Sequence, residues 1–126
     1  MAYENPKDII PGLAAATDLD GEQFMFVSIT GDGLVSLNAT LAAPVDGILQ
    51  DKPLQGQAAS VAAAGVSKCV AGDIVAAGAL VTSDALGKAV TATAGQFFRG
   101  RAITGSSAAG ELISVHLGLM GIVPTP

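Results

Sequence analysis

Short apolar or alternating runs, separated about every 8–12 residues by Gly, Asp, Asn or Pro, dominate the chain from Gln23 onward. This spacing is typical of a β-barrel or β-sandwich, because the strands of such folds are short and joined by tight turns. The Ala-rich pieces 14–16 and 62–65 are too short to nucleate a helix. The sequence therefore predicts an all-β fold, a small β-barrel or β-sandwich of short strands.

Nine segments match this pattern and are predicted to be strands. They are residues 23–29, 34–39, 45–50, 59–64, 67–71, 79–83, 88–93, 97–103 and 111–118. Between the first two strands lies the sequence TGDG (30–33), which predicts a hairpin loop because its glycines can adopt positive φ. The sequence GSSAAG (105–110) predicts a second flexible turn.

The first 22 residues have a different texture, with prolines at positions 6 and 11 and five acidic residues against one lysine. The prolines break any helix that the residues between them could begin. We therefore expect two regions, an extended acidic N-terminal arm over 1–22 and a single β domain over 23–126. Such an arm could add a strand to a neighbouring sheet, and a disordered terminus is the alternative.

The composition predicts a core of small side chains. The chain of 126 residues holds 23 Ala and 16 Gly but only four Phe, one Tyr and no Trp. A core built from such residues buries little apolar surface per ordered residue, and association is one way to cover more. We therefore expect a homo-oligomer.

The charge of the chain argues against nucleic-acid and membrane partners. The net charge is −5, and four of the five excess negative charges lie in residues 1–22. The remainder offers no basic stripe for phosphates, and no window is long and apolar enough for a membrane span. A single cysteine and the absence of a leader pattern indicate folding in the cytoplasm.

No set of residues predicts catalysis, a cofactor or a metal. Cys69 and His116 could form a nucleophile and its base, but a strand position for the histidine and a buried place for the thiol explain them as well. One His and one Cys cannot complete a zinc site without carboxylates. The acidic stretch DLDGE (18–22) lacks the glycine and the final glutamate of a calcium loop. We expect a protein that is not an enzyme.

The stretch from Val45 to Leu117 resembles the small phage capsid decoration (cement, or head-stabilising) proteins. The resemblance rests on VDGILQ (45–50), the hairpin GDIVAAGALVTSDALGKAV (72–90), FFRGRAI (97–103) and AGELISVHL (109–117). It implies a structural virion protein, usually a trimer, that is made in the host cytoplasm, sits on the outer surface of the expanded head and clamps neighbouring major capsid protein subunits together. The resemblance assigns no function to any individual residue.

Candidate contact residues lie in one predicted strand of the β domain and in the N-terminal arm. Phe97 and Phe98 are adjacent on a predicted strand and point to opposite faces, so one should line the core while the other, with Arg99 on its rim, contacts a subunit or the capsid. Core packing of both rings is the alternative. In the arm, Tyr3 and Pro6 are the further candidates.

A second class of function is a carrier domain of the biotinyl or lipoyl kind, or another small β-domain binding module. The hairpin over 72–90 resembles the hammerhead repeat of such carriers. In those proteins the lysine that becomes modified lies at an exposed hairpin tip. The candidates here are Lys68 and Lys88, and neither has a methionine beside it. A small hydrolase or isomerase is a third class, with no residues in its favour.

Overall fold

The computed structural model describes residue 2 and residues 7–125, and these form strands, turns and loops. The described residues contain no helix that could span a membrane. The strands are β1 (Asp8–Ile9), β2 (Ala14–Ala15), β3 (Phe26–Gly31), β4 (Leu34–Leu37), β5 (Gly47–Leu49), β6 (Val61–Ala64), β7 (Val66–Val70), β8 (Leu80–Ser83), β9 (Ala89–Thr91), β10 (Phe97–Phe98), β11 (Gly100–Ala102), β12 (Leu112–His116) and β13 (Gly121–Ile122).

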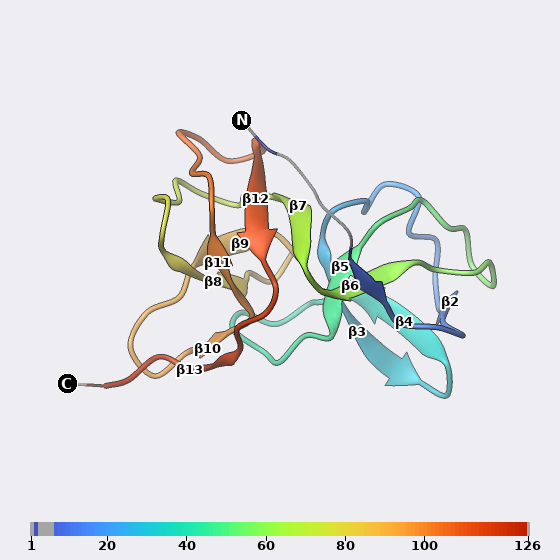
Figure 1. Cartoon of the computed structure of the whole chain (residues 1–126). Helices are drawn as coiled ribbons and strands as arrows, with labels where there is room; N and C mark the ends of the chain where they lie inside the picture. The colour runs from blue at the N-terminus through green and yellow to red at the C-terminus, as the bar shows by residue number, and fades with distance from the viewer. Residues whose placement is uncertain (1, 3–6, 126) are drawn as a thin grey trace.

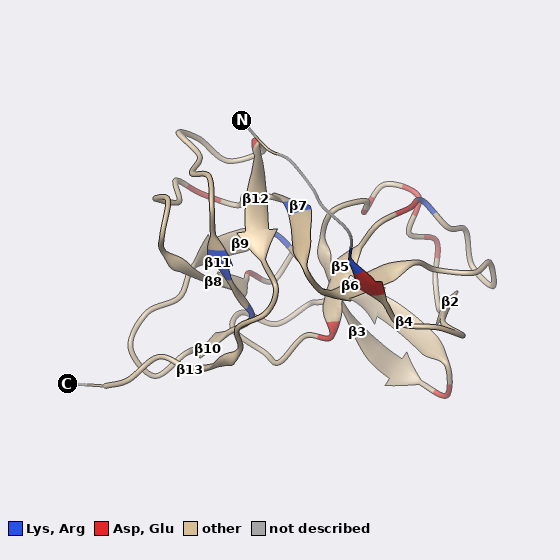
Figure 2. Ribbon diagram, viewed as in Figure 1, with Lys and Arg blue, Asp and Glu red and all other residues tan. Residues whose placement is uncertain are grey.

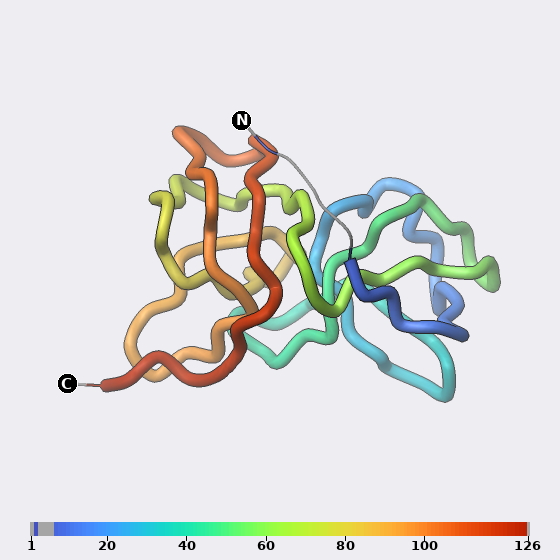
Figure 3. The backbone as a smooth tube through the Cα atoms, in the orientation of Figure 1, coloured from blue at the N-terminus to red at the C-terminus, as the bar shows by residue number. Residues whose placement is uncertain are grey.

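These strands form two parts that lie side by side, one containing β1–β6 and the other β7–β13 (Figure 1). The first part is a six-stranded sheet with the order β1-β6-β5-β3-β4-β2. The second holds a five-stranded sheet, β7-β12-β11-β8-β9, and the two-stranded sheet β10-β13. The backbone passes from one part to the other at Gly65, between β6 and β7 (Figure 3).

The main core lies between the two larger sheets. Alternate residues of a strand point to opposite faces, and Phe26 and Ile48 of the six-stranded sheet are fully buried on the face toward this core. From the five-stranded sheet come buried Cys69, Ile113 and Val115. The alternation that predicted the strands thus also divides their side chains between the core and the surface.

A second, smaller core lies on the opposite face of the six-stranded sheet. It contains Val27 and Leu49, each one residue after a main-core residue, and the buried side chains Leu13, Ala15 and Leu19 cover them. Residues 13–19 therefore contribute to the core of the body. The boundary between arm and domain at residue 22 stays a prediction, and residues 1 and 3–6 of the arm lie outside the described residues.

The predicted fold class is confirmed as an all-β fold consistent with a small sandwich. A bridge between Ala71 and Ala89 joins β7 and β9 locally, but the sheets do not close into a barrel. Each of the nine predicted strands overlaps an observed strand, and the TGDG turn joins β3 to β4 with Gly33 at φ +69°. The predicted strand 97–103 is divided into β10 and β11 by Arg99, and the two-residue strands β1, β2 and β13 were not predicted.

The segment between β4 and β5 reaches from the first part of the molecule to the second. Asn38 donates its side-chain amide to the Ser83 hydroxyl (2.8 Å) and to the Asp84 carbonyl (3.0 Å). Ala42 donates its backbone N–H to the Ser83 carbonyl (2.8 Å) and holds a left-handed conformation with φ 59°. These bonds fix an alanine in a region of φ that a Cβ disfavours.

Replacing Ala42 with glycine is expected to raise the free energy of unfolding by about 0.5–1 kcal/mol, because glycine adopts positive φ without steric cost. Chemical denaturation followed by far-UV circular dichroism measures the change. The matched control is Ala43→Gly, since Ala43 has no positive φ and should lose about 0.5–1 kcal/mol. Equal losses in both variants would contradict strain at Ala42.

Candidate functional site: the β10–β13 patch and Arg99

The predicted contact residues occupy one short stretch and the N-terminal arm. Phe97 and Phe98 form β10, and Arg99 links β10 to β11. Tyr3 and Pro6 lie outside the described residues. The prediction that these five residues contact a subunit or the capsid stays a prediction, while the structure shows where three of them lie.

The two phenylalanines are both half-buried and have different neighbours. Phe97 packs against the main core and is the cross-strand partner of Ile122. Phe98 is paired with Gly121, and its ring lies so close that a Cβ at Gly121 would be 3.3 Å from it. One ring therefore seals the core, and the other covers the backbone of β13.

Arg99 lies inside the molecule instead of on a rim, with 2% of its surface exposed. Its guanidinium donates to four backbone carbonyls: Nη1 to Leu117 (2.7 Å), Nε to Val45 (3.2 Å), and Nη2 to Ala63 (2.7 Å) and Asp46 (3.2 Å). Burial lowers the pKa of Arg99, and the negative charge of Asp46 opposes this effect. Arginine remains protonated in proteins, so a buried cation joins the ends of β5, β6 and β12.

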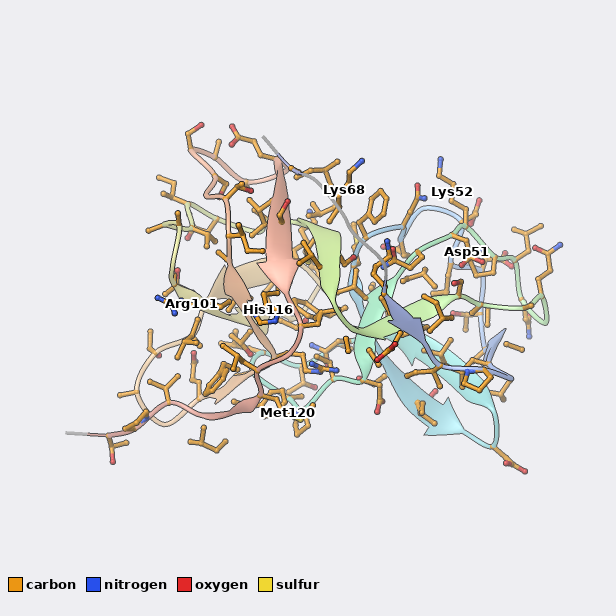
Figure 4. All side chains as sticks on the ribbon, in the orientation of Figure 1. Asp51, Lys52, Lys68, Arg101, His116 and Met120 are labelled. Atoms are coloured by element: carbon orange, nitrogen blue, oxygen red, sulfur yellow. The ribbon has the colours of Figure 1, made fainter. Side chains whose placement is uncertain are left out.

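Exposed apolar residues cluster on the segment that follows β12. Met120 and Ile122 are each 61% exposed, and Leu119 is 40% exposed. Together with Phe97 and Phe98 they form what we call the β10–β13 patch. Figure 4 shows Met120 at the bottom of the second part, away from the charged residues that it labels. The sequence signal for this patch is the uncharged run LGLMGIVPTP at residues 117–126, which contains no chemical motif.

The patch also presents an edge strand. Val123 and the segment 95–96 exchange backbone bonds, from Val123 N–H to the Gln96 carbonyl (2.9 Å) and from Gly95 N–H to the Val123 carbonyl (2.9 Å). In an antiparallel pair the bonding direction alternates, so the backbone groups of Ile122 point away from β10. Natural edge strands usually carry charge or are covered. This edge has no charged residue and is suited to contact with another protein surface.

The residues considered for nucleophilic chemistry lie on opposite faces of one sheet. The Cys69 side chain is fully buried in the main core, whereas His116 is exposed on β12. Burial also raises the pKa of the Cys69 thiol far above its usual range, which keeps it in the unreactive thiol form. The histidine therefore cannot serve as a base for this cysteine.

The two lysines considered for a carrier are both half-buried. Lys68 lies in the middle of β7 with its ammonium 5.8 Å from the centre of the Phe24 ring. Lys88 follows the turn that Asp84 closes by accepting from the backbone N–H groups of Leu86 and Lys88 (2.9 Å each). Neither lysine stands at the tip of a hairpin as a carrier lysine does. In the described part of the chain there is also no pocket and no group of three potential metal ligands.

No protein-family model matches the sequence, and comparison with curated proteins gives no significant match. A solved structure does resemble this chain: the N base of the head fiber gp8.5 of bacteriophage phi29. The TM-score is 0.67 at 17% sequence identity, and the match covers 84% of this chain and 90% of the other. The two chains therefore share a fold over most of their lengths.

Proposed function

We propose that this chain is a structural virion protein that binds the outer surface of an expanded phage head and stabilises contacts between major capsid protein subunits. The observation that carries the proposal is the fold shared with the base of a phage head fiber. The resemblance of residues 45–117 to capsid decoration proteins supports the same role from the sequence. We propose that the chain is not an enzyme and acts as a homo-oligomer, a trimer in the simplest case.

The β10–β13 patch is the surface that we propose for contact with the capsid. Its exposed Leu119, Met120 and Ile122 offer apolar area, and the free edge of β13 offers backbone donors and acceptors. Such a surface binds by burying apolar groups and pairing backbone groups, not by charge. Attachment through this surface would therefore be little affected by salt.

Arg99 supports this surface from within. Its bonds to Leu117 and Val45 hold the end of β12, and with it the start of the 118–122 segment, against the six-stranded sheet. Because the patch is built on these fixed points, its apolar residues are presented on a rigid support. Rigid presentation lowers the entropy cost of binding.

Co-sedimentation with expanded heads that lack the protein tests the proposal, with unexpanded precursor heads as the control particles. We expect wild-type protein to bind expanded heads selectively. The double variant Met120→Asp/Ile122→Asp should lose binding by about a hundredfold or more, because it places two charges in an apolar contact. Failure of the wild-type protein to bind either kind of head would overturn the proposed function.

The matched control variant is Leu86→Asp. Leu86 is as exposed as Met120, at 61%, but it lies in the turn between β8 and β9. We expect this variant to bind heads as the wild type does. Equal losses in the Leu86 variant and in the double variant would show that the β10–β13 patch is not the contact surface.

A further inference from the structure

Charge is distributed unevenly between the two parts of the molecule. Residues 1–64 hold eight of the eleven acidic residues and two of the six basic ones, which gives a net charge of −6. Residues 65–126 hold three acidic and four basic residues, which gives +1. Figure 2 shows this division, with most of the red segments on the part that contains β1–β6. Because one of these four basic residues is the buried Arg99, the chain has an acidic part and a part whose surface is close to neutral.

Two basic side chains lie side by side on the outer face of the five-stranded sheet. Arg101 of β11 is the cross-strand partner of His116 of β12, and both are exposed. Lys68 of β7 does not belong to this exposed pair, because its cross-strand partner Ser114 is fully buried and its ammonium lies 5.8 Å from the centre of the Phe24 ring. Strands β7, β8, β11 and β12 contain no Asp or Glu. We call Arg101 and His116 the basic face (Figure 4).

Arg101 has a fixed orientation, and its Nη donors are available for a partner. Its Nε–H donates to the carbonyl of Gly78 (2.9 Å), which fixes the plane of the guanidinium. Among the described residues its Nη groups have no hydrogen-bond partner, and no acidic residue forms an ion pair with it. A fixed arginine fork is the usual partner of a carboxylate. Arg99 differs from Arg101 because its guanidinium donors are bonded to backbone carbonyls in the interior of the molecule.

The acidic part offers carboxylates on two adjoining loops. Leu19 donates to the Pro53 carbonyl (2.8 Å), and Gln55 donates to the Asp18 carboxylate (2.9 Å), so loops 17–22 and 51–57 lie together. The carboxylates on these loops are those of Asp18, Asp20, Glu22 and Asp51, which we call the acidic rim. Lys52 is the only basic residue on either loop. The rim therefore has the charge opposite to that of the basic face.

We propose that the basic face of one copy binds the acidic rim of a second copy, head to tail. The inference rests on the proposed function in that it specifies the surfaces of the proposed oligomer. Charge complementarity favours a second copy, because the chain supplies both signs on separate surfaces while its overall charge would repel other pairings. A head-to-tail contact that closes by rotation forms a ring, and the proposed trimer is one such ring.

Two variants with the same change in net charge test this pairing. Arg101→Glu removes the guanidinium from the basic face, whereas Lys52→Glu makes the acidic rim more negative. By sedimentation velocity over a range of concentrations, Arg101→Glu should weaken self-association by about tenfold or more, and Lys52→Glu should leave it unchanged or tighten it. Association of the wild type should weaken between about 0.05 M and about 0.5 M NaCl. Equal weakening in both variants, or association insensitive to salt, would overturn the proposal.

Mixing two broken variants tests the head-to-tail geometry and shows that both still fold. Arg101→Glu keeps an intact rim, and Asp20→Lys/Glu22→Lys keeps an intact basic face. Each alone should be monomeric, and an equal mixture should form a dimer and no larger species, because only one complementary contact remains. A mixture that stays monomeric would overturn the proposal.

This test uses the protein alone, so its failure would leave the proposed binding to heads intact. A wild-type chain that is monomeric at every concentration would overturn the head-to-tail pairing. If Arg101→Glu then also lost binding to expanded heads, the basic face would be assigned to the capsid protein. Loss of head binding only in the Met120/Ile122 double variant would instead support the β10–β13 patch as the contact with the capsid.

Discussion

Replacing Arg99 with methionine is expected to lower the free energy of unfolding by about 3–5 kcal/mol. The guanidinium supplies donors to four carbonyls, and methionine fills similar space but leaves those acceptors without these bonds. The loss is a large share of the ~5–15 kcal/mol that stabilises a typical domain. Guanidinium chloride denaturation followed by far-UV circular dichroism measures it, since the chain has no tryptophan for fluorescence.

The same substitution at Arg101 is the control for this prediction. Arg101 is exposed and makes one hydrogen bond, of 2.9 Å, to the Gly78 carbonyl, so Arg101→Met should change the free energy of unfolding by less than about 1 kcal/mol. The two arginines are two residues apart and differ only in their surroundings. Equal effects at both positions would contradict the internal role of Arg99.

The effect on head binding follows from where the four carbonyls lie. Leu117 precedes the segment that carries Leu119 and Met120, and Val45 precedes β5. Without the guanidinium the β10–β13 patch loses the Arg99 bonds that attach it to the six-stranded sheet. We therefore expect Arg99→Met to weaken the proposed binding to heads even at temperatures where the variant remains folded.

The strands could be predicted from the sequence because local alternation determines them. In β7, for example, the sequence VSKCV alternates between buried and half-buried residues as the period of two requires. The two-residue strands β2 and β13 escaped prediction because two residues show no period. The burial of Leu13 and Leu19 could not be predicted, because prolines and acidic residues surround them in the sequence. Composition does not show which residues pack against a sheet that is distant in sequence.

The interior position of Arg99 could not be predicted for a related reason. An arginine beside two phenylalanines is typical of a contact surface, and nothing local shows that four carbonyls from distant segments converge on it. The sequence separations in these bonds reach 54 residues. The β10–β13 patch had a clearer signal, an uncharged run near the end of the sequence, but its exposure depends on how few residues cover β13.

Replacing Gly47 with alanine is expected to lower the free energy of unfolding by roughly 3 kcal/mol or more. Gly47 begins β5 in the interior of the six-stranded sheet, and an added Cβ would collide with the Ala62 carbonyl and lie 2.9 Å from Val61 Cγ1. The backbone of a paired strand cannot move aside as a flexible side chain can. The same denaturation measurement detects the loss, and a soluble yield far below that of the wild type would agree with it.

Gly21→Ala is the matched control, because an added Cβ at Gly21 meets no atom within 4 Å. Its free energy of unfolding should change by less than about 1 kcal/mol. Gly47 also follows directly on Val45 and Asp46, whose carbonyls accept from Arg99. A collision there displaces the guanidinium as well as β6, so Gly47→Ala combined with Arg99→Met should cost less than the sum of the two single changes. Simple additivity would show that the close approach of β5 to β6 and the arginine act independently.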